Sequence, residues 1–147
     1  MLTKNHAVLE AEVSAHVAAD AVVGGEYWTP MNNAVGGKGC FIGCLAHSED
    51  AEILGERFGL PLPLVKIAES IFEHLPADKG KAFFAALPGA IAADGKDLSL
   101  IHWKFLAAEL RSLPATPSHI QDVIDPVIAG MDLLAGGGEW PKDAAYA

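Results

Sequence analysis

The stretch LVKIAESIFEHLP, residues 64–76, indicates the fold class of this chain most clearly. Its apolar side chains recur at intervals of three and four residues, which places them along one face of an α-helix. Pro63 suits the first position of such a helix, and Pro76 cannot continue it. The stretch therefore predicts an amphipathic helix over residues 63–75 whose apolar face is buried against other elements.

The same spacing recurs on both sides of this stretch. It predicts helices over residues 5–23, 39–47, 49–58, 63–75, 78–87, 98–113 and 118–134. We therefore expect an all-α protein, a compact single-domain bundle of about seven helices over residues 1–138. Residues 139–147, which follow a run of three glycines, are expected to form a loosely ordered tail.

Local signals set the expected ends of these helices. Gly24-Gly25 and Pro88-Gly89 are expected to end two of them. Ser118 followed by Gln121 has the pattern of a capping box at the start of the last helix. Residues 26–38, which are rich in Gly and Asn, are expected to form an irregular connector.

The composition restricts the classes of function. Aromatic residues make up only 7% of the chain, which favours helices over a β-sandwich or barrel. The formal net charge of −9 repels a phosphate backbone, and no cluster of Lys and Arg offsets it, so we expect no nucleic-acid partner. The longest uncharged apolar stretch, residues 82–93, is shorter than the ~20 residues of a membrane span, so we expect no membrane partner. Because we see no secretion signal and only two closely spaced cysteines, we expect a reduced, cytoplasmic setting.

The segment GCFIGCLAH, residues 39–47, carries the most chemistry in the sequence. In a helix that begins near its first glycine, Cys40, Cys44 and His47 fall at i, i+4 and i+7, on one face. Cys40 then lies in the first turn, where free backbone amides favour a thiolate. The pattern fits a reactive thiol, a dithiol redox pair or part of a soft-metal site. A purely structural explanation stays open, because free Cys packs as a small apolar residue and the two glycines allow another helix to approach closely.

A row of polar residues lies in the first predicted helix. Glu12, His16 and Asp20 are spaced four residues apart and border the apolar face. In this arrangement Asp20 accepts a hydrogen bond from His16 and orients its ring, as for a general base or a metal ligand. The alternative is an ordinary surface pair at a helix end. The functional interpretation predicts that His16 shares a pocket with Cys40 or Cys44.

A second acidic row, Glu69 and Glu73, lies on the predicted helix 63–75. Two such carboxylates facing histidines can build a di-metal centre, but those bundles use Glu-x-x-His motifs, and no suitable helix carries one here. We therefore expect Glu69, Glu73 and His74 to form a solvated face. Phosphate-binding loops, nucleophile elbows and His-Glu-x-x-His or Cys-x-x-Cys motifs are absent from the sequence.

Together these residues resemble a family of small, uncharacterised, all-helical proteins of bacteria and their phages, which carry a Gly-Cys-x-x-Gly-Cys-x-x-His segment. The similar features are Ala15-His16, Ala19-Asp20, Tyr27-Trp28, Gly37 to Cys44 with His47, Phe58 to Pro61, Ile71 to Pro76 and Phe84 to Pro88. The similarity spans most of the chain, as far as Glu139-Trp140. It implies an all-helical fold and groups His16, Asp20, Cys40, Cys44 and His47 as one set, but it implies no activity.

The cysteine segment is also similar to that of the alkylhydroperoxidase-D-like helical proteins. These carry two cysteines separated by two residues, followed by a histidine, at a helix start. Here three residues separate Cys40 from Cys44, and two separate Cys44 from His47. This spacing changes which helix faces the sulfurs occupy compared with that family, and it argues against a disulfide.

We expect a small helical binding or interaction protein whose function the sequence does not specify. A small-molecule pocket is expected where the first helix meets the Cys40 helix, with Trp28, Cys44 and His47 as ligand-binding residues. A homodimer is an expected assembly, and the sequence indicates no particular cofactor.

The alternative is a cysteine-dependent enzyme. Cys40 is then the nucleophile or redox thiol, His16 or His47 is the base, and Asp20 orients His16. A metal-binding protein is a further alternative, with Cys40, Cys44, His47 and His16 as ligands.

Overall fold

The computed structural model describes residues 1–140, and these form an all-α protein with one small sheet. The expected fold class, with seven helices in the described residues, is confirmed. The elements are α1 (His6–Ala18), β1 (Trp28–Pro30), β2 (Gly37–Gly39), α2 (Phe41–Ala46), α3 (Glu52–Phe58), α4 (Leu62–His74), α5 (Ala77–Ile91), α6 (Ile101–Ser112) and α7 (Ser118–Ala135). Among them, no helix combines the length and the apolar character that crossing a membrane requires.

The chain divides into two compact units, Met1–Leu98 and Ser99–Ala147. We expected a single domain over residues 1–138, and that range includes parts of both units. Helical periodicity shows which face of a helix is apolar but not which helix packs against it, so the single-domain expectation stays a prediction. Of the expected tail, Trp140 lies against Gly130 of α7, and residues 141–147 lie outside the described residues.

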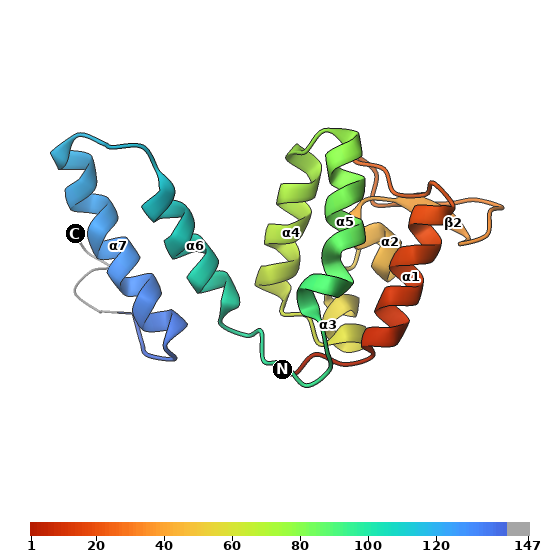
Figure 1. The fold of residues 1–147 in the computed structure, drawn as a ribbon, viewed down its shortest axis with the longest axis horizontal. Coiled ribbons are helices and arrows are strands. Elements are labelled where there is room, and N and C mark those ends of the chain that lie inside the picture. Colours follow the sequence, from red (N-terminus) through yellow and green to blue (C-terminus); the bar gives the residue numbers. More distant parts are fainter. Residues whose placement is uncertain (141–147) are drawn as a thin grey trace. The chain divides into compact units, whose positions relative to one another are not determined.

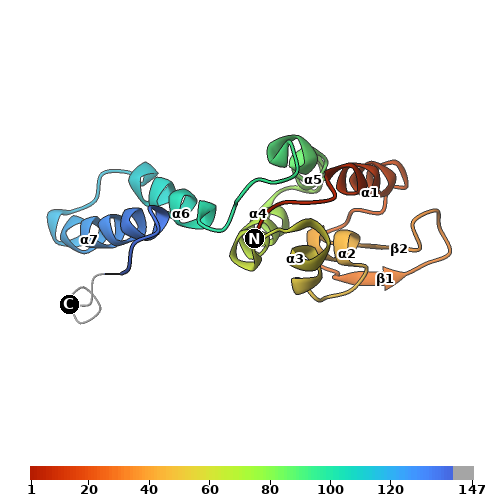
Figure 2. The ribbon, with the colours of Figure 1, turned by 90° about the horizontal axis from the view of Figure 1, so that it is seen from below.

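In the first unit, α2 is the buried centre. All six of its residues are buried, and it contacts α1, α3, α4 and β2. Figures 1 and 2 show α1 and α5 side by side on one face of the unit, with α2, α3 and the two strands beneath them in Figure 2. Burial of the apolar side chains supplies the main stabilising contribution. Large buried members of this core are Leu9, Phe41, Ile42, Leu45, Leu54, Phe58, Val65, Phe72 and Phe84.

The segment expected to be an irregular connector contains a β-hairpin. Strands β1 and β2 pair in antiparallel fashion, with Trp28 opposite Gly39 and Pro30 opposite Gly37. The second strand runs directly into α2, so Cys40 has an extended backbone and is the N-cap of α2. We expected Cys40 inside the first helical turn. The strand pairing of the preceding residue delays the start of the helix.

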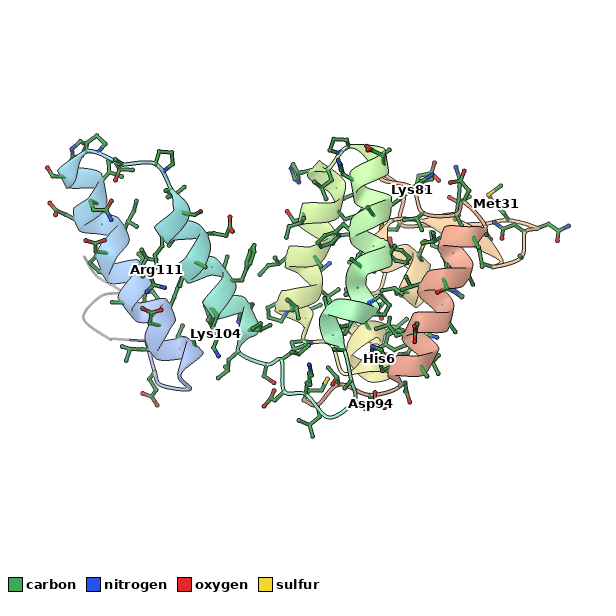
Figure 3. All side chains as sticks on the ribbon, in the orientation of Figure 1. His6, Met31, Lys81, Asp94, Lys104 and Arg111 are labelled. Atoms are coloured by element: carbon green, nitrogen blue, oxygen red, sulfur yellow. The ribbon has the colours of Figure 1, made fainter. Side chains whose placement is uncertain are left out.

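Several helix ends differ from the expected ones. Helix α1 ends at Ala18, well before Gly24-Gly25. Helix α5 continues through Pro88 to Ile91, and Pro88 is buried like Phe84 and Ile91. The backbone oxygen of Pro88 is 2.8 Å from Nε2 of His6, which is labelled in Figure 3.

The expected capping box does not form at the start of α7. The N-cap is Pro117, and no side chain makes a capping hydrogen bond there. The amide of Gln121 instead bonds to Thr116 and to Asp125.

The second unit contains the consecutive helices α6 and α7, which lie side by side (Figure 1). Arg111 of α6, labelled in Figure 3, forms an ion pair with Asp132 of α7. The buried residues of the two helices are His102, Ala107 and Gly130. Burial lowers the pKa of His102.

Candidate functional site

Polar side chains gather at both ends of the buried helix α2. Cys40 precedes the helix and His47 follows it, as its N-cap and C-cap. The hairpin reaches both ends, since Tyr27 lines a cavity beside Cys40 and Trp28 stacks on His47. We name the first group, Cys40 with Glu69 and Glu73, the Cys40 cluster. The second group, His16 with Trp28 and His47, is named the His16 cluster.

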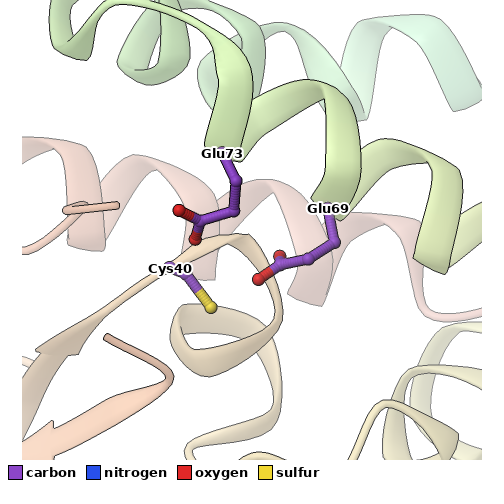
Figure 4. A group of neighbouring side chains, drawn as sticks. All are labelled: Cys40, Glu69 and Glu73. Carbon is purple, nitrogen blue, oxygen red and sulfur yellow. The ribbon is translucent and has the colours of Figure 1, made fainter. Parts of the chain in front are cut away.

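The Cys40 cluster brings one thiol and two carboxylates together. One ligand atom from each of Cys40, Glu69 and Glu73 lies within 4.8 Å of the others. Figure 4 shows the sulfur and the two carboxylates turned toward one another, from the start of α2 and from α4. Glu69 and Glu73 stand one helical turn apart on α4, which is why both reach the same sulfur.

Backbone N–H groups hold both carboxylates in place. The N–H of Ile42 donates to Oε2 of Glu69 at 3.0 Å, and the N–H of Gly25 donates to Oε2 of Glu73 at 2.8 Å. Each carboxylate therefore has one oxygen fixed by a backbone donor. This kind of support orients ligand groups in binding sites.

The environment of the thiol favours its protonated form. Burial, together with the neighbouring Glu69 carboxylate, raises the pKa of Cys40 to about 12. Burial also raises the pKa of Glu69, although the hydrogen bond from Cys40 opposes that shift. At neutral pH Cys40 is a neutral thiol next to a carboxylate. We expected a thiolate at Cys40 in the first helical turn, and this expectation is wrong. Cys40 precedes the helix with an extended backbone, and burial and the neighbouring carboxylate favour its protonated form.

A cavity of about 200 Å³ opens at this cluster. Its lining residues are Gly25, Glu26, Tyr27, Cys40, Glu69 and Glu73. Three of these six residues carry carboxylates, and one of the three, Glu26, pairs with Lys38 at 3.4 Å. The cavity is thus rich in anionic acceptors and suits a small cation.

The His16 cluster lies at the opposite end of α2. The Trp28 and His47 rings are stacked, with their centroids 4.6 Å apart, and the His16 and His47 centroids are 5.2 Å apart. His16 is only 2% exposed, whereas His47 is exposed. Burial lowers the pKa of His47, with a further contribution from His16.

The expected pairing of His16 with Asp20 is wrong. Nδ1 of His16 lies 2.8 Å from the backbone oxygen of Glu12, which therefore accepts its hydrogen bond. Because α1 ends at Ala18, Asp20 leaves the helical row, with a left-handed backbone at φ 52°. Its carboxylate pairs with Lys81 of α5, labelled in Figure 3. The hydrogen bond and charge of Lys81 lower the pKa of Asp20.

The expected ligand set of Cys40, Cys44, His47 and His16 is not brought together. Within residues 1–140, the group of three or more ligand atoms close enough to share an ion is the Cys40 cluster. Cys44 is fully buried, its Sγ donates to the backbone oxygen of Gly39 at 3.2 Å, and burial raises its pKa to about 12. Cys44 is thus a packing residue, and His16 does not line the Cys40 cavity.

Glu69 and Glu73 are the site residues that sequence reasoning missed. We expected a solvated face, but Glu69 is half-buried and both carboxylates face Cys40. Their spacing by four residues beside an apolar stripe was the available signal. That spacing indicates a site only when it is known that Cys40 lies opposite the two glutamates. The contact between α2 and α4 that brings them together is a long-range feature that periodicity does not encode.

Comparison with known proteins does not identify a relative. No protein-family model matches the chain, and no match is found among curated proteins or solved structures.

Proposed function

We propose that the first unit binds a divalent metal ion through Cys40, Glu69 and Glu73. The convergence of one sulfur and two carboxylates within 4.8 Å, at a cavity of about 200 Å³, carries this proposal. Like the expectation from the sequence, this proposal gives the protein a binding function and places the site at Cys40. It changes the ligands, because carboxylates of α4 replace Cys44, His47 and His16.

The donor types suit a borderline ion such as Zn²⁺. Zinc accepts thiolate sulfur at about 2.3 Å and carboxylate oxygen at about 2.0–2.2 Å, and it favours four ligands. A tetrahedral ion holds its donors about 3.5 Å apart, so the three groups need to close by about 1 Å. The open cavity leaves the fourth position to water, as in sites that act on a bound molecule.

Electrostatics also favours a cation here. The nearby carboxylate and the burial that raise the pKa of Cys40 make this place unfavourable for a bare thiolate. A divalent ion reverses that balance, because a coordinating thiol gives up its proton. Binding converts the S–H bond to a metal–sulfur bond and releases one proton to the solvent.

Titration calorimetry with Zn²⁺ tests the proposal. Wild type should bind one ion at this site, and Glu69→Gln should weaken binding at least about tenfold because it removes a ligand charge. Glu10→Gln is the matched control, since Glu10 is an exposed glutamate of α1 remote from the cluster in sequence. Equal affinities for wild type and Glu69→Gln would contradict the proposal.

The proximity of the Cys40 thiol to the Glu69 carboxylate supports a second candidate function, thiol chemistry with Glu69 as the base. Here Glu69 takes the thiol proton as the sulfur attacks an electrophile that enters the cavity. The raised pKa of Cys40 makes this the weaker candidate, because the nucleophile is the thiolate. Rapid alkylation of Cys40 by iodoacetamide at neutral pH, lost in Glu69→Gln, would support it over metal binding.

The wider expectations remain predictions. They are a small-molecule partner, a homodimer, a cytoplasmic setting, no binding to nucleic acid, and membership of the small helical family of bacteria and phages. The net charge of −9 supports the absence of a nucleic-acid partner.

A further inference from the structure

Two buried acceptor atoms beside α2 lack a partner. Nε2 of His16 and Oε2 of Glu12 are buried and have no hydrogen-bond partner among the described residues. Because Nδ1 of His16 faces the backbone oxygen of Glu12 at 2.8 Å, Nδ1 is the donor, and in the neutral tautomer Nε2 is then an acceptor. Buried acceptors without a donor are costly, and a cation bound by the ring nitrogen of His16 removes one of these two costs.

The position of His47 fits this need. An ion about 2.0–2.1 Å from a ring nitrogen lies about 3.2 Å from the ring centre, so two imidazoles on one tetrahedral ion have centres about 5 Å apart. The centroids of His16 and His47 are 5.2 Å apart, and their planes are inclined at 56°. Burial keeps His47 neutral by lowering its pKa, which is the form that binds metal.

The charges around this place are nearly balanced. Arg57 forms an ion pair with Glu12 and donates to the backbone oxygen of Leu45 at 2.6 Å. The positive charge of Arg57 repels a metal ion at this place, and the negative charge of Glu12 offsets that repulsion. The backbone acceptor on Nδ1 of His16 is the support that metal-binding histidines commonly have.

We propose that a divalent transition-metal ion binds between Nε2 of His16 and the ring of His47, with Glu12 as the nearby anion. This site is separate from the Cys40 cluster and does not depend on the proposed function. Trp28, stacked on His47, covers it, and waters complete the coordination.

The test uses the full chain carrying Cys40→Ala, in which the thiol site is removed. Zn²⁺ is added while the side-chain ¹⁵N resonances of the histidines are followed by NMR. One equivalent of Zn²⁺ should shift the Nε2 resonance of His16 and one ring nitrogen of His47. His74 is the internal control, because it is exposed and its Nδ1 likewise lies near a backbone oxygen one turn earlier, that of Ser70 at 2.7 Å.

Two variants complete the test. His47→Gln alters an exposed side chain, so the core stays intact, and it should weaken Zn²⁺ binding at least about tenfold. His74→Gln should leave the affinity unchanged. Unshifted His16 and His47 resonances, or equal losses in both variants, would overturn the proposal. Because Cys40 is absent throughout, these outcomes are independent of whether the Cys40 cluster binds metal.

Discussion

The backbone oxygen of Tyr27 lies directly over Gly43, so that a Cβ added at Gly43 would be 1.3 Å from it. A Cβ at Gly39 would be 2.1 Å from the same oxygen. Both glycines of the GCFIGC segment therefore let the backbone before β1 pack against the start of α2. We expected these glycines to admit another helix, and the hairpin takes that place. This contact sets Tyr27 beside Cys40 and Trp28 beside His47.

Gly43→Ala should destabilise the protein by about 3 kcal/mol, because the new methyl group collides with backbone and not with a flexible side chain. The control is Gly89→Ala on α5, where no atom lies within 4 Å of an added Cβ. That change should stabilise the helix by about 0.5–1 kcal/mol. Urea unfolding of both variants measures the difference, and a mild effect at Gly43 would contradict the close approach of Tyr27.

Both cysteines should be nearly inert to iodoacetamide in the folded protein at neutral pH, because burial raises the pKa of each to about 12. Glu69→Gln should increase the alkylation rate of Cys40 in alkaline buffer, since it removes the acidic neighbour that raises the pKa of Cys40. Glu73→Gln is the matched control and should have the smaller effect. Mass spectrometry locates the modified cysteine, and equal rates in the two variants would count against the hydrogen bond to Glu69.

The stability of the fold should decline between about pH 9 and about pH 12 because of Cys44. Its pKa is 9.0 without the fold and about 12 within it, so the unfolded chain loses the proton first. The folded state then binds more protons, and stability falls as the pH rises, by up to about 1.4 kcal/mol per pH unit for one thiol.

Cys44→Ala isolates this contribution from other groups that titrate in the same range. The difference in unfolding free energy between wild type and Cys44→Ala should shrink as the pH rises through this interval. A difference that stays constant with pH would show that the Cys44 thiol is not buried as described.

Asp20→Asn should leave stability nearly unchanged, because the pair with Lys81 is exposed to solvent. It should leave the ¹⁵N resonances of His16 in place, since His16 is held by the backbone of Glu12. Histidine NMR of the variant checks this directly. A large shift at His16 would restore the His16–Asp20 pair that we expected from the sequence.

Helix content was predictable from sequence because it depends on local periodicity. The stripe that includes Ile71 and Phe72 gave α4 to within a residue or two at its ends. The hairpin was missed because its strands are only three residues long and contain Gly and Pro, which local propensity assigns to loops.

The candidate site was predictable only in part, for a related reason. The sequence singled out Cys40, His16 and His47, and the structure places them at or beside the ends of α2, while their roles stay predictions. Their partners come from other elements: Glu69 from α4 for Cys40, and Trp28 from β1 for His47. Spacing along one helix does not contain these contacts. Asp20 was mispaired because α1 ends one turn earlier than its sequence suggests.

The absorption spectrum of the protein titrated with Co²⁺ tests the Cys40 site most directly, because sulfur bound to cobalt gives a charge-transfer band that nitrogen and oxygen ligands do not. Our account predicts this band at one equivalent in wild type. It predicts loss of the band in Cys40→Ala, a weaker band at equal Co²⁺ in Glu69→Gln, and an unchanged band in Cys44→Ala. A wild-type titration without the band, or a band that survives Cys40→Ala, would contradict the proposal that Cys40, Glu69 and Glu73 bind a metal ion.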